Sequence, residues 1–430
     1  MKKFDKLTAS LCAAACAFSV CACAAPPRAE LLGEPKNVPK NMYVSNNAEF
    51  DGFCDGLVSF SSKLTAATYG GTTYAVSPVS VYLALSIVAE CADGETERQL
   101  LSALNTDRAA LAANYPMLYG SLYSERTIDG KTIALTEPNN SIWLGKNVGH
   151  KTDCIASLAD NYYCYSYAAD FANDNEAANN AVKKFVSDKT RGLIDKDFGF
   201  SPNTLFAIIN TLYLKDVWRM FGDELEMTKE QYTFSGMTSS SKVNLLWGDY
   251  HTCRVYSGNG FEACYTVTEF GNRLLFIVPD DEHSLNDVFT EENINAAISY
   301  DYVAAAIDDE HKKIFNTSCL FPEFSADYDG DITSILASEF GISDMFTPSC
   351  DLGRLTDEQA YCSQIQHVTK LDVNRKGIEG AAVTSVMIGA AAGDPGEYEY
   401  VYETFTVDKA FGFAILDGDA VMFSGAVTDL

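Results

Sequence analysis

The stretch NRKGIEGAAVTSVMIGAAAGDPGE, Asn374 to Glu397, combines features that rarely occur together, and the fold is inferred outward from it. From Gly380 to Gly393 there is no charged side chain, although 21% of the residues in the chain are charged. Glycine, alanine, serine and β-branched residues dominate this run, and such a composition disfavours a helix. The run is also too short and too weakly apolar to cross a membrane. Charged residues and glycines flank it, so the sequence predicts a strand-like segment where an exposed loop is expected.

The size and charge of the chain limit its possible functions. With 430 residues, the chain can bury a large core as one big domain or as two ordinary ones. A formal net charge of −28 argues against nucleic acid as a partner, because phosphate binding needs a basic surface. We interpret the acidity as a source of solubility for a protein that works outside the cytoplasm.

The N-terminus has the features of an export signal. MKKFDK is a basic start and LTASLCAAACAFSVCACAA is apolar and rich in small residues, so residues 1–22 are predicted to be a signal peptide. Val20-Cys21-Ala22-Cys23 resembles a bacterial lipobox, in which Cys23 would carry the lipid anchor. The alternative is ordinary cleavage after Ala24 or Ala25, followed by release. Residues 23–45 contain four prolines and are predicted to be a tether. We therefore expect an exported protein, either secreted or attached to a membrane through this lipid alone.

Cysteines, histidines and sequence motifs indicate no metal site and no enzyme. The nine cysteines after the signal region are odd in number and form no CxxC motif. We interpret most of them as small buried hydrophobic residues and leave their pairing open. The five histidines are scattered, and the chain has no GxSxG, HExxH or P-loop motif. We therefore expect no metal, no cofactor and no catalytic residue. The nine cysteines are Cys54, Cys91, Cys154, Cys164, Cys253, Cys264, Cys319, Cys350 and Cys362.

The spacing of apolar residues predicts helices in the first half of the chain and strands in the second. Helical spacing covers Gly56–Tyr69 and Ala177–Leu193. The string TYAVSPVSVYLALSIVAECADGETERQLLSAL predicts a short strand and then a long apolar helix that starts at Ser77 and Pro78. No linker divides residues 46–430, which we interpret as one large α+β domain with buried sheets. The strand-like runs are TLFAIINTLYL, RLLFIVP, FGFAIL and AVMFSGAV.

Seven strings spread over Asn46 to Leu430 together resemble the sequences of serpins. The resemblance covers nearly the whole mature chain, and it implies an α+β serpin fold of three β-sheets and eight or nine helices with an exposed reactive loop near the C-terminus. The stretch that begins at Asn374 is similar to that loop. In the family's order, the strings are SPVSVYLALSIVAECADGETERQL, NTLYLKDVW, FPEF, DLGRLTD, QHVTKLDVNRKGIEGAAVTS, VDKAFGFAI and MFSGAV.

The resemblance implies a suicide-substrate inhibitor of serine proteases that acts as a monomer. In serpins, a protease attacks the reactive loop and forms an acyl-enzyme ester, and the cut loop then inserts into the largest sheet as a new strand. The residues of the loop are suited to insertion into a sheet, whether or not the chain belongs to this family. An inserting strand must bury alternate positions, and Ile378, Ala382 and Thr384 on that face carry no charge. The implied hinge of the loop is Gly377, Ile378, Glu379, Gly380, Ala381, Ala382, Val383 and Thr384.

The family's usual loop length places the scissile bond near Ala391–Ala392, within the window 389–393. A small apolar residue suits proteases with a shallow specificity pocket, so elastase-like serine proteases are the expected partners. Trypsin-like enzymes are not expected, because there is no Lys or Arg between Lys376 and Lys409.

A polar cluster under the central strands of the family's sheet is matched by four residues of this chain. Physically, such hydrogen bonds can hold two strands together and yet exchange partners when a third strand arrives. The matching residues are Ser77, Ser80, Asn210 and His367.

At the top of the sheet, where insertion begins, the family has a Trp and a Lys–Glu pair. Trp218 matches the Trp, and Glu323 and Arg375 occupy the other two positions with their charges exchanged. We therefore expect a Glu323–Arg375 salt bridge that restrains early opening of the sheet.

Two other functions stay open. A non-inhibitory binding protein of the serpin fold would carry charged or bulky polar residues on the inserting face, and this chain has none there. Ile378 and Gly380 replace the usual Thr and Ala, but both are uncharged. An inhibitor of cysteine proteases could use the same loop.

Overall fold

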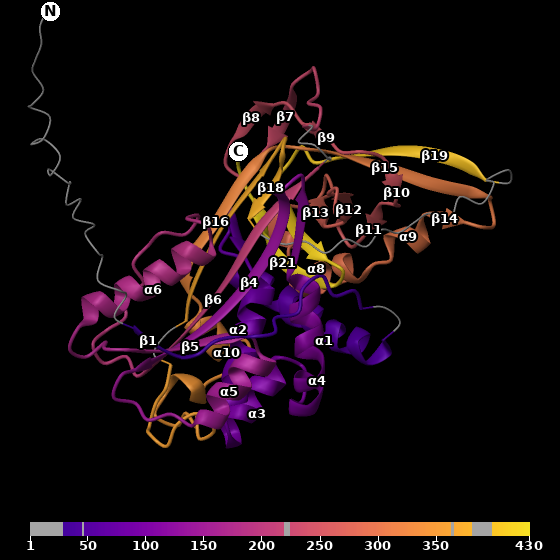
Figure 1. The fold of residues 1–430 in the computed structure, drawn as a ribbon. Helices are drawn as coiled ribbons and strands as arrows, with labels where there is room; N and C mark the ends of the chain where they lie inside the picture. The colour runs from indigo at the N-terminus through magenta and orange to yellow at the C-terminus, as the bar shows by residue number, and fades with distance from the viewer. Residues whose placement is uncertain (1–28, 45–46, 219–223, 363–364, 381–397) are drawn as a thin grey trace, which may run out of the picture.

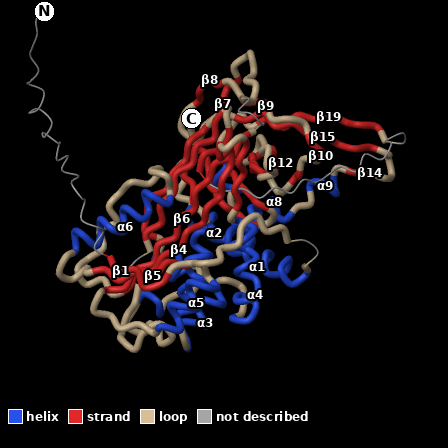
Figure 2. The backbone as a smooth tube through the Cα atoms, in the orientation of Figure 1, coloured by secondary structure: helices blue, strands red, loops and turns tan. Residues whose placement is uncertain are grey.

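The computed structural model describes residues 29–44, 47–218, 224–362, 365–380 and 398–430. Most helices gather at one end of the molecule, and the strands form the body above them (Figure 2). The predicted helix at Gly56–Tyr69 is part of α1, and the one at Ala177–Leu193 corresponds to α6. The α-helices in the described residues are α1 (Ala48–Thr68), α2 (Pro78–Cys91), α3 (Gly94–Ala103), α4 (Arg108–Leu122), α5 (Thr152–Asn161), α6 (Asn175–Lys189), α7 (Leu285–Val288), α8 (Glu291–Ser299), α9 (Tyr302–Ala305) and α10 (Thr333–Ser338).

The largest sheet, called sheet A, has eight described strands in the order β1-β5-β4-β6-β18-β17-β16, with β3 paired to β4. Strands β6 and β17 lie near its middle and are more than 140 residues apart in the chain. The strands are β1 (Ala29–Gly33), β3 (Ser124–Ile128), β4 (Lys131–Gly145), β5 (Cys164–Ala169), β6 (Phe206–Val217), β16 (Phe324–Asp331), β17 (Gln366–Asn374) and β18 (Gly377–Gly380).

Two smaller sheets and a short hairpin complete the β structure of the described residues. Sheet B has the order β11-β12-β13-β20-β21-β2, and sheet C joins β14, β15, β19, β9 and β10. Part of sheet C projects from the body as an arm (Figure 1). The strands are β2 (Tyr74–Val76), β9 (Leu246–Trp247), β10 (His251–Thr252), β11 (Tyr256–Ser257), β12 (Phe261–Val267), β13 (Arg273–Pro279), β14 (Ile307–Asp308), β15 (Lys313–Phe321), β19 (Glu399–Thr406), β20 (Phe411–Asp417) and β21 (Ala420–Val427), with β7 (Tyr232–Ser235) and β8 (Ser240–Val243) as the hairpin.

Burial of both faces explains why the strand-like runs do not alternate between apolar and polar residues. All seven residues of β20 and all eight of β21 are buried, because sheet B has packed elements on both faces. A second, smaller core lies where α6 packs on sheet A, with Trp143, Phe185 and Phe200 among its members. All nine cysteines after the signal region are buried, as most of them were predicted to be.

The long helix predicted after Ser77 is wrong in one respect, because it is two helices. The first ends at Cys91, and the second begins after Asp93, which is its N-cap residue. Gly94 has φ +61°, a left-handed conformation that breaks a continuous helix and favours glycine.

The predicted tether also needs a correction. Within residues 23–45, Ala29–Gly33 forms the edge strand β1 of sheet A, antiparallel to β5. The backbone N–H groups of Asn41 and Met42 donate to the carbonyls of Tyr123 and Gly120. Proline content suggested an extended chain here, but backbone pairing with an open sheet edge holds this part against the fold.

In the part of the chain that the structure describes, no helix combines the length and the apolar character needed to cross a bilayer.

Candidate site of strand insertion

Sheet A has an interruption at its centre that β18 fills only at one end. Strand β18 is antiparallel to both neighbours, with Ile378 paired to Asp216 of β6 and to Val373 of β17. Beyond β18, residues 206–213 of β6 and 366–371 of β17 have a described ladder partner on one side only. Below β18, the facing edges of these two strands therefore have no ladder partner among the described residues.

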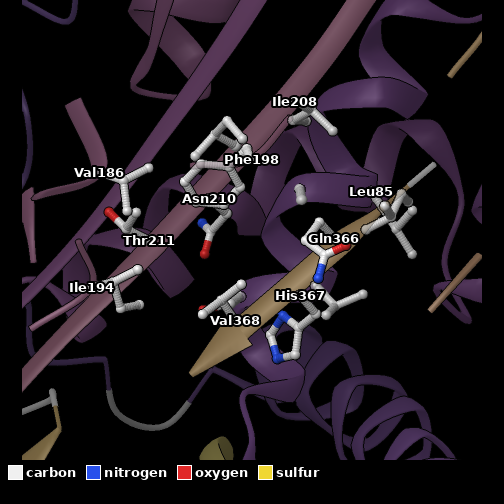
Figure 3. A pocket seen from close by; sticks show the side chains of 15 residues that line it. Leu85, Val186, Ile194, Phe198, Ile208, Asn210, Thr211, Gln366, His367 and Val368 are labelled. Carbon is white, nitrogen blue, oxygen red and sulfur yellow. The ribbon is translucent and has the colours of Figure 1, made fainter. Parts of the chain in front are cut away.

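Hollows lie along this gap. A cavity of about 40 Å³ is lined by Asn210 and Thr211 from β6 and by His367 and Val368 from β17. Figure 3 shows these side chains between the two strands, with Phe198 and others over them. A larger hollow of about 420 Å³ lies beside it, lined by β16, β17 and residues 193–196 and by no residue of β6. The described residues thus leave a small cavity between β6 and β17.

Two polar atoms in the gap have no hydrogen-bond partner among the described residues. They are Asn210 Oδ1 and Thr211 Oγ1, and both are shielded from solvent. The amide of Asn210 donates instead to Asn140 Oδ1 at 2.5 Å, and the amide of Asn140 donates to the Tyr115 hydroxyl at 2.9 Å. A buried acceptor without a donor destabilises a structure by about 1–3 kcal/mol. A strand that brought a donor to Asn210 would relieve this.

Sequence reasoning missed Asn140, Tyr115 and Thr211. The paired asparagines in PNNSIW, inside an otherwise strand-like run, were the available signal for Asn140.

The other three residues of the predicted polar cluster contact one another. The backbone N–H of Ser77 donates to His367 Nε2 at 3.0 Å, and the Ser77 hydroxyl donates to the Ser80 hydroxyl at 2.9 Å. Burial lowers the pKa of His367 to about 4, so the ring is neutral at physiological pH and Nε2 accepts. All four predicted residues, including Asn210, line one small cavity below the gap.

At the top of sheet A, Trp218 directly follows β6 and links the end of that strand to the end of β17. Its indole Nε1–H donates to the carbonyl of Asn374 at 2.6 Å, and its ring packs edge-on against Phe321 with centroids 5.5 Å apart. Trp218 is buried, so this bond is protected from water.

The predicted Glu323–Arg375 salt bridge is wrong, because each group has another partner. The guanidinium Nε of Arg375 pairs with Glu224 Oε2 at 2.7 Å. The Glu323 carboxylate accepts from the backbone N–H of Arg375 at 2.8 Å. Arg375 lies in the tight turn between β17 and β18, where its backbone N–H faces Glu323 and its guanidinium reaches Glu224. The sequence identified both residues but not the group of Arg375 that Glu323 binds.

The described part of the hinge is already a strand. A Cβ at Gly377 would clash with the carbonyl oxygen of Asp216, so only glycine fits there. Ile378 is buried and Glu379 is exposed, with the Tyr213 hydroxyl donating to Glu379 Oε1 at 3.2 Å. The hinge residues Ala381, Ala382, Val383 and Thr384 and the bond Ala391–Ala392 lie outside the described residues, as does Cys23.

Asp216 places a carboxylate beneath the hinge. It is 2% exposed, accepts from the backbone N–H of Val217 at 2.7 Å, and accepts from the Asn272 amide at 2.6 Å. Burial raises its pKa to about 7, more than these hydrogen bonds lower it. An acidic residue inside the apolar run NTLYLKDVW was the signal that sequence reasoning passed over.

Comparison with known proteins gives one consistent result. The family profile described as Serpin (serine protease inhibitor) matches residues 58–430. An "Uncharacterized serpin-like protein" of Methanosarcina acetivorans is 24% identical over 371 residues, which cover 82% of this chain and 80% of the relative. "Serine protease inhibitor 42Dd" of Drosophila melanogaster is also 24% identical, over 85% of this chain and 93% of its own. The native state of the thermophilic serpin Tengpin superposes with a TM-score of 0.69 at 22% identity, over 92% of this chain and 97% of that one. The likeness to this structure confirms the predicted fold.

Proposed function

Since the chain belongs to the serpin family, we propose that it is a suicide-substrate inhibitor of serine proteases, whose cut loop inserts between β6 and β17. Serpins are generally protease inhibitors and not enzymes. The observation that carries the proposal is the gap in sheet A, which is bordered by facing strand edges and filled at one end by the hinge.

The register of β18 indicates how the following residues would fit. Gly380 pairs with Leu214 of β6, and Glu379 pairs with Asp372 of β17. Continued in the same register, the inserted strand would place Thr384 between Asn210 and His367. Directly paired residues share a face of the sheet, so the Thr384 hydroxyl would face the unpartnered Asn210 Oδ1. The polar residue of the inserting face thus falls where the gap holds polar groups.

The free energy of insertion is large enough for the proposed role. A strand bonded to both edges gains on the order of ten ladder hydrogen bonds at about 1 kcal/mol net each, or roughly 10 kcal/mol. This is comparable to the whole stability of an ordinary domain, about 5–15 kcal/mol. A protease linked to the moving loop through its ester could therefore be distorted.

The finer assignments complete the proposal. The target is an elastase-like serine protease, because Ala391 and Ala392 at the expected scissile bond are small and apolar. The serpin domain is residues 46–430 together with β1, preceded by the signal peptide 1–22. The protein is exported and acts as a monomer at the cell surface or after secretion, and a lipid on Cys23 would be its membrane anchor.

The test is a matched pair of substitutions on opposite faces of the inserting strand. In the continued register, residue 382 falls between Leu212 and Thr369, which are buried. Residue 381 falls on the face of the exposed Glu379, between Tyr213, whose hydroxyl binds Glu379, and the exposed Lys370. Ala382→Glu would have to bury a charge, so we expect it to be cleaved without forming a covalent complex. Ala381→Glu keeps its charge in water and should still trap the protease.

The readout is a denaturing gel after mixing with an elastase or a trypsin, followed by sequencing of the released C-terminal peptide. An undissociated adduct with elastase supports the inhibitor. Cleavage of the unaltered protein without an adduct would contradict it and favour the binding protein, and an adduct with a papain-like enzyme alone would favour the cysteine protease inhibitor.

A further inference from the structure

Half of the large hydrophobic side chains that the described residues expose lie on one face of sheet C. There are ten such side chains, and these five are each between 43% and 64% exposed. Single exposed hydrophobic residues are ordinary on soluble proteins, whereas a contiguous group marks an interaction surface. We call the five residues the aromatic face: Trp247, Tyr250, Ile307, Tyr400 and Tyr402.

Strand register places Ile307, Tyr400, Tyr402 and Trp247 on the same side of sheet C, with the buried Ser318 and Leu320 between Tyr402 and Trp247. Residues directly opposite each other in a sheet point to the same side. The Tyr250 ring lies edge-on to the Tyr402 ring at 5.3 Å, which places it on that side as well. None of the residues in these rows is charged, although the chain carries a net charge of −28. The rows are Ile307, Ile314 and Tyr400; Thr252, Asn316 and Tyr402; Ser318 and Thr404; and Trp247, Leu320 and Thr406.

The aromatic face lies close to the proposed cleavage site along the chain. Strand β19, which carries Tyr400 and Tyr402, begins at Glu399. Its first residue is six to ten positions after the scissile window 389–393, a distance of at most about 36 Å for an extended chain. A protease that holds this window is therefore within reach of the arm formed by β14, β15 and β19 (Figure 1).

We propose that the aromatic face docks against the target protease, outside its active site, and speeds its capture. The inference rests on the proposed inhibitory function. Tyrosine and tryptophan are enriched among the residues that contribute most to protein interfaces. Their rings also attract Lys and Arg side chains, and acidic groups such as Asp249 and Glu399 lie beside the face in sequence. The partner surface should accordingly be an apolar patch edged by basic residues, because an acidic one would be repelled by this chain.

The experiment compares two double variants in the full-length protein. Tyr400→Ser with Tyr402→Ser removes the two rings next to the loop, and Tyr43→Ser with Tyr361→Ser is the control. The control residues are similarly exposed, at 64% and 39%, but lie outside sheet C. The second-order rate constant for covalent complex formation with an elastase-like protease should fall about tenfold in the first variant and stay unchanged in the control. The number of inhibitor molecules consumed per protease should not change, since insertion occurs in sheet A.

Each result decides between the proposals. Equal rate constants in both variants and the unaltered protein would overturn docking by the aromatic face and leave inhibition standing. No covalent complex with the unaltered protein would overturn both. A concentration-dependent dimer in sedimentation that the first variant abolishes would assign the face to a second copy of this chain. If the double variant melts at a lower temperature, Tyr402→Thr alone replaces it in the same comparison.

Discussion

Asp216→Asn should make the folded protein more stable at neutral pH and should make its stability rise with pH between about pH 4 and 6.5. Burial raises the pKa of Asp216 from 3.8 to about 7, so the folded state binds the proton more tightly than the unfolded state. The ionised carboxylate therefore destabilises the fold progressively as the pH rises from 3.8 to 7, and by a constant amount above. One pKa unit is worth about 1.4 kcal/mol, which makes this about 4 kcal/mol.

The asparagine variant removes that charge but loses one hydrogen bond. Its Oδ1 can still accept from Val217, whereas its NH₂ group cannot accept from Asn272, a loss of about 1 kcal/mol. The expected net gain is about 3 kcal/mol at pH 7.5. At pH 4, where Asp216 is largely protonated, the variant should be equal to the original protein or slightly less stable.

His367 has the opposite effect on how the stability of the fold depends on pH. Burial lowers its pKa from 6.5 to about 4, so the unfolded state binds this proton more tightly and stability is lost as the pH falls from 6.5 to 4. The stability lost through this group over that pH range is about 3 kcal/mol. In the unaltered protein the two slopes nearly cancel over this window. Asp216→Asn should expose the His367 slope, and adding His367→Gln should flatten the profile again.

The assay is the free energy of denaturant unfolding, followed by circular dichroism at half-unit steps from pH 4 to pH 8. If the curves of Asp216→Asn and the unaltered protein run parallel over this range, Asp216 is not an isolated buried carboxyl and the reasoning is refuted.

Three further outcomes follow from the same geometry. Cleavage within 389–393 by a trace of protease should raise the melting temperature. The expected rise is roughly 10 °C, which is the insertion free energy of about 10 kcal/mol divided by the unfolding entropy of some 400 residues. An unchanged melting curve would mean that the loop does not insert. Gly377→Ala should lower stability by about 1–3 kcal/mol through overpacking, measured by thermal melting, and a neutral result would show that β18 does not lie against β6 in solution. In a double-mutant cycle, Arg375 and Glu224 should show a coupling energy of about 0.5 kcal/mol, because the pair is half-exposed. The effects of Arg375→Ala and Glu323→Gln on stability should instead be additive, because Glu323 binds a backbone N–H that both variants keep.

The sequence by itself determined those features that depend on local chemistry. The alternation after Gly377 follows from a period of two residues, and the helix start at Ser77 and Pro78 follows from residue types that favour a helix N-terminus. The strands β20 and β21 follow from uninterrupted apolar runs. Each segment carries its own signal without reference to the rest. The residues of the polar cluster were identified in the same way, through short strings similar to those of a known family.

Only the tertiary structure decided how distant segments meet. Arg375 pairs with Glu224, not Glu323, because the pairing depends on which of several carboxylates the turn presents to the guanidinium. The aromatic face is assembled from three strands and a loop between residues 247 and 402, and no local sequence pattern predicts how these strands pair. Burial of Asp216 likewise depends on Asn272 and Ile378 from elsewhere in the chain. Local pattern fixes which side of a strand is apolar, but pairing partners, desolvation and the gap in sheet A arise from contacts whose geometry is set by the whole fold.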